Sequence, residues 1–263
     1  LPSTLASKAG PDSLIVAIVG SLLYLLLAMM LVKLIEKFPK STIIEIGRSL
    51  VGKPFGKILG LGYFLYILAL IVLEIRTFGE ISKNFLLIST PIEVIIISFL
   101  LTSIYVVRSG METIARLSVI VLPFSMIPAL LVMFLILPEI DPTYFLPVLR
   151  TPPIELIKAI CEMSFSFLGF EFILFLAFFI KDQKNIKKCG KAAVVTIASI
   201  YIFTIFTIIG RFGIQESKSL IWPTITLFKT VDIPGTLIEN VEIVVMATWL
   251  LSIFMTVVVT YFG

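Results

Sequence analysis

The residues with the clearest potential for chemistry form a short polar stretch inside a long apolar run. Ser164-Phe165-Ser166-Phe167-Leu168-Gly169-Phe170-Glu171 places two hydroxyls, a glycine and a carboxylate near the middle of residues 155–180. A helix that opens there exposes backbone donors and acceptors, which is costly in hydrocarbon unless the segment lines a cavity. Discontinuous helices of this kind bind small charged solutes at their half-helix ends. The stretch therefore predicts a ligand site with these candidates: Ser164, Phe165, Ser166, Phe167, Gly169, Phe170 and Glu171.

Both the stretch and its carboxylate have a second interpretation. An unbroken helix would also accept this sequence, with the serine hydroxyls donating to carbonyls of their own helix and Gly169 packing against a neighbour. Glu171 is either a group that titrates or binds a cation, or a cap on the amino end of the second half-helix. A capping carboxylate stabilises such an end by about 0.3–1 kcal/mol. The sequence favours neither interpretation of Glu171.

A few polar side chains in other apolar runs are further candidates for ligand binding. Tyr63 and Tyr66 lie near the centre of the second run, where aromatic packing is the alternative role. Thr248 and Ser252 lie near the middle of the last run, where small hydroxyls commonly hold helices together.

Three ionisable residues follow the second run. Arg76 and Glu80 are four positions apart, a spacing that predicts a salt bridge at the membrane interface. Glu74 lies deeper and has no basic residue three or four positions away. An ionisable side chain inside a span is costly, so we expect Glu74 to act in coupling or gating.

The residues that most enzymes need are missing from this sequence. It contains no histidine, which excludes a Ser-His triad and a histidine metal cluster. It has no P-loop, no GxSxG elbow and no zinc-binding HExxH motif. Cys161 and Cys189 are expected about a membrane thickness apart, too far to pair. We therefore expect no metal, no cofactor and no enzymatic activity.

The composition places the elements that carry these residues in a membrane. The chain has 263 residues, of which 59% are hydrophobic and 14% charged, with a mean hydropathy of +1.11. Soluble domains carry about 45–50% apolar and about 25% charged residues. The first apolar run, of 20 residues without a charge, is long enough for a helix to cross about 30 Å of hydrocarbon. An all-α integral membrane protein with about seven spans is predicted: Ser13–Val32, Phe55–Leu73, Pro91–Val107, Leu117–Leu137, Glu155–Ile180, Ala192–Ile209 and Leu237–Phe262.

The basic residues indicate which side of the membrane each connection occupies. Most lie after the first, third and fifth runs, which the positive-inside rule places in the cytoplasm. They are Lys33, Lys37, Lys40, Arg48, Lys53, Lys57, Arg108, Arg116, Lys181, Lys184, Lys187, Lys188 and Lys191. No concentrated patch forms, so we expect contact with anionic lipid and no nucleic-acid partner. In the first of these connections, Thr42 and Glu45 predict a capping box and an in-plane helix.

Four segments in this order resemble the spore germination permease family. They are Leu1–Asp12, Gly110–Arg116, Phe145–Leu149 and Ser164–Glu171, and the resemblance extends over nearly the whole chain. This family comprises the B subunits of the nutrient germinant receptors of endospore-forming bacteria. It belongs to the amino acid–polyamine–organocation superfamily, which implies a LeuT/APC-like fold of two inverted five-helix repeats with broken first and sixth helices.

The resemblance implies a mapping of the spans. The seven runs would be helices two to eight of ten, Leu1–Gly10 the outer end of helix one, and Ser164–Glu171 the break in helix six. Residues 1–263 would then form a single transmembrane permease-like domain, a truncated inverted-repeat helical bundle that is incomplete at both ends. Tyr63 and Tyr66 would lie on helix three, and Thr248 and Ser252 on helix eight. A loop from Ser217 to Pro234, with Trp222 as a gating candidate, would be an outer lid by analogy.

The resemblance also implies a function and partners. We expect a multi-pass subunit of the spore inner membrane that binds a small nutrient at a midplane site and triggers germination. The expected nutrient is an amino acid. A membrane A subunit and a lipoprotein C subunit would be its partners. The first alternative is a proton-coupled amino acid transporter in which Glu74 or Glu171 titrates. The second is a membrane-embedded enzyme, for which the usual motif sets are missing.

Overall fold

The computed structural model describes residues 1–180, 185–230 and 241–262, and in these ranges the chain forms helices without a β-strand. An all-α membrane protein was predicted, and the helical class is confirmed. The chain divides into two compact units. Unit 1 combines Leu1–Ser41 with Val132–Asp232, and unit 2 combines Thr42–Leu131 with Ile233–Gly263. The expectation of a single domain stays a prediction beside this division.

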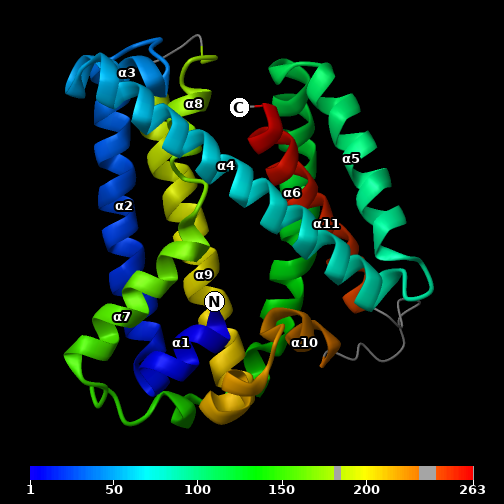
Figure 1. Ribbon diagram of the computed structural model, residues 1–263. Helices are drawn as coiled ribbons and strands as arrows, with labels where there is room; N and C mark the ends of the chain where they lie inside the picture. Colours follow the sequence, from blue (N-terminus) through cyan, green and yellow to red (C-terminus); the bar gives the residue numbers. More distant parts are fainter. Residues whose placement is uncertain (181–184, 231–240, 263) are drawn as a thin grey trace. The chain divides into compact units, whose positions relative to one another are not determined.

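Unit 1 is built around two long helices that run side by side. Its elements are α1 (Pro2–Ala9), η1 (Gly10–Asp12), α2 (Ser13–Lys37), η3 (Leu137–Glu139), η4 (Pro142–Phe145), α7 (Pro153–Met163), η5 (Ser164–Phe167), α8 (Phe172–Leu176), α9 (Ile186–Ser219) and α10 (Pro223–Lys229). In Figure 1, α2 (blue) packs along α9 (yellow), and the short α1 lies against both α7 and α9.

Small residues let the elements of unit 1 approach closely. A Cβ atom added to Gly20 of α2 would lie 2.6 Å from the sulfur of Met163 at the end of α7. A Cβ atom on Gly190 of α9 would lie 2.8 Å from the Cδ1 of Ile173 in α8. Helices in lipid gain no hydrophobic driving force from one another, so close van der Waals packing over glycine is a main source of their association.

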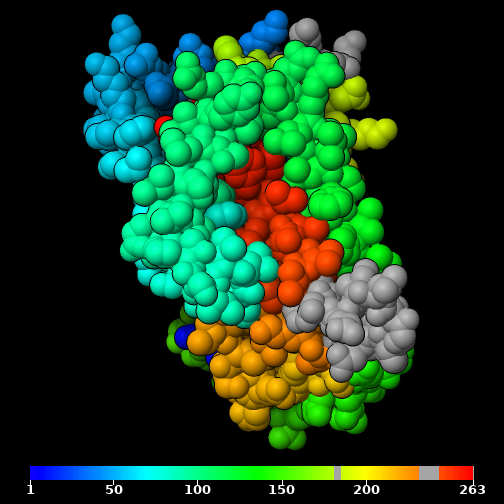
Figure 2. All heavy atoms as spheres, turned by 90° about the vertical axis from the view of Figure 1, so that its right-hand side faces the viewer, coloured from blue at the N-terminus to red at the C-terminus, as the bar shows by residue number. Residues whose placement is uncertain are grey.

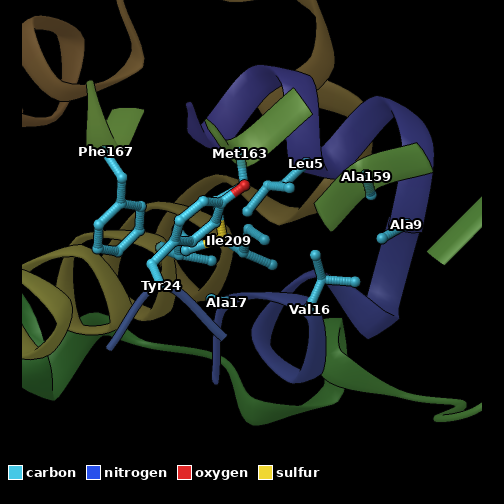
Figure 3. Close-up of a cluster of buried hydrophobic side chains, with 10 residues drawn as sticks. Leu5, Ala9, Val16, Ala17, Tyr24, Ala159, Met163, Phe167 and Ile209 are labelled. Atoms are coloured by element: carbon cyan, nitrogen blue, oxygen red, sulfur yellow. The ribbon is translucent and has the colours of Figure 1, made fainter. Parts of the chain in front are cut away.

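The core of unit 1 lies where α1, α2, α7 and α9 meet. Figure 3 shows its buried side chains, among which Leu5, Met163 and Ile209 are fully buried. The aromatic end of this core is formed by Tyr24 and Phe167. The core therefore extends from α1 to η5, the segment predicted to be broken.

Unit 2 is arranged around its last helix. Its elements are α3 (Ile43–Val51), α4 (Lys53–Ile81), the π-helix η2 (Ser82–Leu86), α5 (Ile92–Arg108), α6 (Met111–Ile136, to Leu131 in this unit) and α11 (Val241–Phe262). Figure 2 shows α11, in red and orange, between the green α5 and α6. Met255 and Val258 of α11 pack with Ile114 and Val121 of α6 to form the core here.

The predicted capping box is confirmed at the start of α3. The backbone N–H of Thr42 donates to Glu45 Oε2 at 2.8 Å, and the N–H of Glu45 donates to Thr42 Oγ1 at 3.3 Å. Two of the helix's otherwise unpaired donors are satisfied in this way. After α3 the chain turns back at Gly52, whose φ of 83° favours glycine, and α4 begins to pack against α3.

Six helical segments within the described ranges, some of them made of several consecutive elements, are long and apolar enough to cross a membrane. They are Pro2–Lys37, Lys53–Leu86, Met111–Glu139, Pro153–Leu176, Ile186–Ser219 and Ile243–Phe262. The remaining predicted run, Pro91–Val107, forms α5, whose 17 residues span about 26 Å, at the short end for a crossing helix. A multi-pass membrane protein is therefore confirmed, and the count of seven spans stays a prediction.

Candidate functional site

The predicted break in the fifth apolar run is present in unit 1. The α-helix α7 ends at Met163, a single 3₁₀ turn covers Ser164–Phe167, and α8 begins only at Phe172. Between them Leu168 is extended, with ψ 138°, and Gly169 has φ 102°. A side chain at that φ is strained, so glycine is what lets the chain change direction here. The alternative of one unbroken helix is therefore wrong.

Two tyrosines from neighbouring helices satisfy carbonyls that the break exposes. The hydroxyl of Tyr24 in α2 donates to the carbonyl of Ile160 at 3.1 Å. The hydroxyl of Tyr201 in α9 donates to the carbonyl of Ser166 at 2.5 Å. The backbone N–H of Ser164 donates to the carbonyls of Cys161 and Glu162 instead of that of Ile160. The Ile160 carbonyl is therefore left for Tyr24. Because an unpaired carbonyl costs several kcal/mol in hydrocarbon, these hydroxyls stabilise the open conformation.

The same tyrosines form an aromatic wall with Phe167. The rings of Tyr24 and Phe167 are stacked, with centroids 4.6 Å apart and planes 13° apart. Tyr201 meets the edge of Phe167 at 5.2 Å. Figure 3 shows the Tyr24 and Phe167 rings lying beside each other at one end of the core. The 3₁₀ turn is thus held on both sides by rings whose polar ends point at backbone carbonyls.

Glu171 holds the turn in a way that neither sequence interpretation described. Both carboxylate oxygens accept from the backbone N–H of Gly169, at 3.1 and 3.0 Å. Glu171 occupies the N-cap position of α8, but its side chain makes no capping hydrogen bond to that helix. The carboxylate therefore does not cap α8, as the second interpretation expected, but accepts from Gly169 before that helix. The carboxylate closes the turn around Gly169, and its titration stays a prediction.

The remaining candidates of the stretch differ in their surroundings. Ser164 Oγ donates to the carbonyl of Cys161 at 2.6 Å, and Phe165 is 75% exposed. Phe170 is partly buried against the core of unit 1. The last carbonyls of α7 therefore gather beside Ser164, where the negative end of a helix favours an ammonium group. With only five residues, α8 supplies little complementary positive end.

The predicted site residues of unit 2 pack within their own unit. Ser252 Oγ of α11 donates to Ser125 Oγ of α6 at 2.7 Å, the interhelical contact expected of small hydroxyls. Thr248 is buried and donates to the carbonyl of Val245 at 2.9 Å. The rings of Tyr63 and Tyr66 lie 6.1 Å apart on α4. A ligand role for these four residues stays a prediction.

The gating candidates lie on α4 and before α10. Glu74 is half-buried, and the predicted salt bridge beside it is confirmed, with Arg76 Nε 2.7 Å from Glu80 Oε1. Trp222 is the N-cap of α10. In its described part, residues 217–230, the predicted lid is largely helical rather than a loop, because Ser217 still belongs to α9 and Pro223–Lys229 form α10. Pro234, the end of that lid, lies outside the described residues.

Sequence reasoning missed Tyr24 and Tyr201. Each is the one tyrosine of its apolar run, and packing is the ordinary role of such a residue. A broken helix needs hydrogen-bond donors from other helices for its exposed carbonyls. A search of the other apolar runs for side chains with such a donor could therefore have found these tyrosines. In the described part of the chain, no cluster of acidic and cysteine side chains is arranged to hold a metal ion.

Comparison with known proteins shows a family likeness over the whole chain. The family model described as spore germination protein matches residues 1–263. The chain is 28% identical to spore germination protein YndE of Bacillus subtilis (strain 168), over 100% of this chain and 73% of that protein. It is 30% identical to spore germination protein A2 of Bacillus subtilis (98% and 71%) and 28% identical to spore germination protein GerLB of Bacillus cereus (95% and 67%).

Proposed function

Because the chain belongs to the spore permease family of spore germination proteins, we propose that it is the membrane subunit of a nutrient germinant receptor. In this proposal a small nutrient binds at the broken segment of unit 1, and its binding triggers germination. The observation that carries the proposal is the interruption between Met163 and Phe172 inside an apolar run. Backbone groups at such a depth are retained where they serve a bound solute.

The chemistry of the segment favours an amino acid as the nutrient. An ammonium group suits the carbonyls at the end of α7, beside Ser164, and an apolar side chain suits Phe165, which is exposed in the same turn. A carboxylate would compete with Glu171 for the N–H of Gly169, so ligand binding and the turn are linked. The ligand can shift the protein between states only by binding one of them more tightly.

The proposed fold is the LeuT/APC-like inverted repeat, with α7 and α8 as the halves of helix six. Support comes from the position of the break, and from α1, a short helix that packs against α7 as the outer part of a broken helix one would. Transporters of this architecture place their ligand at such discontinuous helices. We also propose a membrane A subunit and a lipoprotein C subunit as partners, and the spore inner membrane as the location.

Substitution of Gly169 tests the ligand site. Alanine at φ 102° has a strained backbone conformation. Its Cβ would meet only Phe172 Cδ2 at 3.9 Å, an ordinary contact. The substitution therefore strains the backbone without causing a steric clash. In spores that carry the full-length gene with Gly169→Ala, we expect the amino acid concentration for half-maximal germination to rise at least tenfold. The probe is a mixture of the twenty common amino acids, and receptor level is measured by immunoblot.

The matched control is Gly62→Ala in α4, where an added Cβ finds open space. This control should respond as the unchanged protein does. An unchanged response of Gly169→Ala at normal receptor level would contradict the proposed site. Reconstitution of the full-length protein with a labelled amino acid separates the two alternatives of mechanism, because accumulation driven by a pH gradient would identify a transporter and binding without accumulation a sensor.

A further inference from the structure

Asp12 is a carboxylate with no exposed surface, at the turn η1 between α1 and α2. Carboxylates are almost never fully buried unless they are paired or hydrogen-bonded, because desolvation of the charge is expensive. This residue lies in η1, outside the broken segment itself. Its partners therefore show what the buried charge is for.

The partners of Asp12 are backbone amides far away in the sequence. The N–H of Leu149 donates to Asp12 Oδ1, and the N–H of Thr151 donates to Asp12 Oδ2 at 2.9 Å. Thr151 Oγ1 also donates to the carbonyl of Ala9 at 2.8 Å, beside the same turn. The contacts cross 137 to 142 residues of sequence, and all of them lie within unit 1.

The backbone of residues 149–151 is shaped to receive an anion. Leu149 has φ 58°, a left-handed conformation that is uncommon for a bulky residue, and its side chain is 72% exposed. The loop thus turns its amide groups inward and its apolar side chain outward. Consecutive N–H groups around a left-handed residue form a concave anion site, called a nest. Here the nest is filled by the chain's own carboxylate.

The nest lies directly before the helix that leads to the break. Thr151 is two residues from Pro153, the first residue of α7, and the last residue of α7 is Met163. Asp12 therefore ties the start of α7 to the α1–α2 turn, while Leu5 and Ala9 of α1 pack in the core with Ala159 and Met163.

From this geometry we propose that Asp12 is a positioning residue: it fixes the outer end of α7, and with it the broken segment, by filling a carboxylate site at residues 149–151. The part of the proposal that concerns nutrient response rests on the proposed function. The carboxylate site itself does not. An isolated small carboxylate such as formate should occupy the nest when the side chain of Asp12 is removed.

Limited proteolysis tests the carboxylate site without reference to germination. Arg150 is exposed in the middle of the nest, so release of this loop should speed cleavage by trypsin after Arg150. For the full-length protein in lipid nanodiscs, we expect Asp12→Ala to raise that cleavage rate at least tenfold, as identified by the mass of the fragment. Formate at 100 mM should reverse at least half of the increase, and chloride at the same concentration should not.

A matched control is available in Asp141, on a neighbouring connection of unit 1. Its Oδ1 accepts from the N–H and the hydroxyl of Thr143, at 2.8 and 2.6 Å, so it caps only its own turn. Asp141→Ala should leave cleavage after Arg150 unchanged, with or without formate. If Asp12→Ala cannot be purified, Asp12→Asn replaces it, because the amide keeps the shape and loses the charge, and an increase of at least threefold is expected.

Nutrient response then tests the positioning role. Spores with Asp12→Ala should need at least tenfold more of the amino acid mixture at normal receptor level, and formate should lower that requirement. Unchanged cleavage after Arg150 would overturn the carboxylate site, and faster cleavage with an unchanged nutrient response would overturn the positioning role. If Gly169→Ala also has no effect on germination, the proposed function fails, while the formate result still decides the carboxylate site.

Discussion

At the scale of single residues, a broken membrane helix is stable only if its exposed backbone groups find hydrogen-bond partners. Every carbonyl that leaves the helical ladder needs a donor, and hydrocarbon offers none. Tyr24 and Tyr201 supply donors to Ile160 and Ser166, and each does so with a ring that also covers Phe167. A tyrosine combines an apolar body with one polar end, which suits this position better than a serine or a lysine would.

Removal of one hydroxyl should therefore destabilise unit 1. In Tyr201→Phe the carbonyl of Ser166 loses its 2.5 Å partner while the ring contact with Phe167 remains. The Ser166 carbonyl is part-buried, so we expect loss of this hydrogen bond to lower the free energy of unfolding by about 0.5–1.5 kcal/mol. Thermal unfolding of the purified full-length protein in detergent measures the change.

Tyr105→Phe in α5 is the control for this substitution, because Tyr105 is 76% exposed. Its thermal midpoint should match that of the unchanged protein. Equal midpoints for Tyr201→Phe and Tyr105→Phe would show that the Tyr201 hydroxyl does not support the broken segment.

At the scale of elements, glycines decide how closely neighbouring helices pack. The pair α3 and α4 in unit 2 shows this most clearly. A Cβ atom on Gly56 of α4 would lie 2.6 Å from Arg48 Cγ and 2.8 Å from Arg48 Cα in α3. The nearest obstacle thus includes backbone, which cannot rotate away as a side chain can. Small residues at such contacts allow two helix backbones to touch.

Gly56→Ala should consequently push α3 away from α4. Alanine favours a helix over glycine by about 1 kcal/mol, but the overlap with the Arg48 backbone should outweigh this gain. We expect a net loss of about 1–3 kcal/mol in the free energy of unfolding, measured by thermal unfolding in detergent. In the control Gly62→Ala, the added methyl group meets no atom within 4 Å, so stability should stay the same or rise. A rise for both variants would contradict the close contact.

At the scale of the whole molecule, the large exposed apolar surface requires lipid. Exposed leucines, isoleucines and phenylalanines occur along α2, α4, α5 and α6, and the most hydropathic stretch of Lys53–Leu86 has no buried residue. Soluble proteins rarely expose apolar patches of this extent. The distribution of basic residues adds an orientation to this membrane assignment, with the amino end of α9 predicted on the cytoplasmic side.

Thiol labelling checks this orientation. Cys189 is exposed near the end of α9 that is predicted to be cytoplasmic, and Ser219 is the last residue of the same helix. In a Cys161→Ser background, a membrane-impermeant maleimide should leave Cys189 unlabelled in intact cells and label it after permeabilisation. With Cys189→Ser and Ser219→Cys added instead, labelling should occur in intact cells. The opposite pattern would reverse the assigned topology.

Local signals in the sequence determined much of this protein. Runs of apolar residues determined the helices and the membrane, because the length of a run and its lack of charge are properties of neighbouring residues. The spacing of Thr42 and Glu45 determined a cap, and that of Arg76 and Glu80 an ion pair. The polar stretch ending at Glu171 determined where the fifth run breaks.

Only the tertiary structure decided which groups hold that break open. The donor to Ile160 comes from 136 residues away, and the amides that receive Asp12 from 137 and 139 residues away. No local pattern selects such partners, because a hydroxyl or a carboxylate can satisfy any backbone group that packing brings within reach. The sequence therefore predicted that the broken segment needs hydrogen-bond partners. Which residues serve as those partners was decided by the packing of α1, α2, α7 and α9.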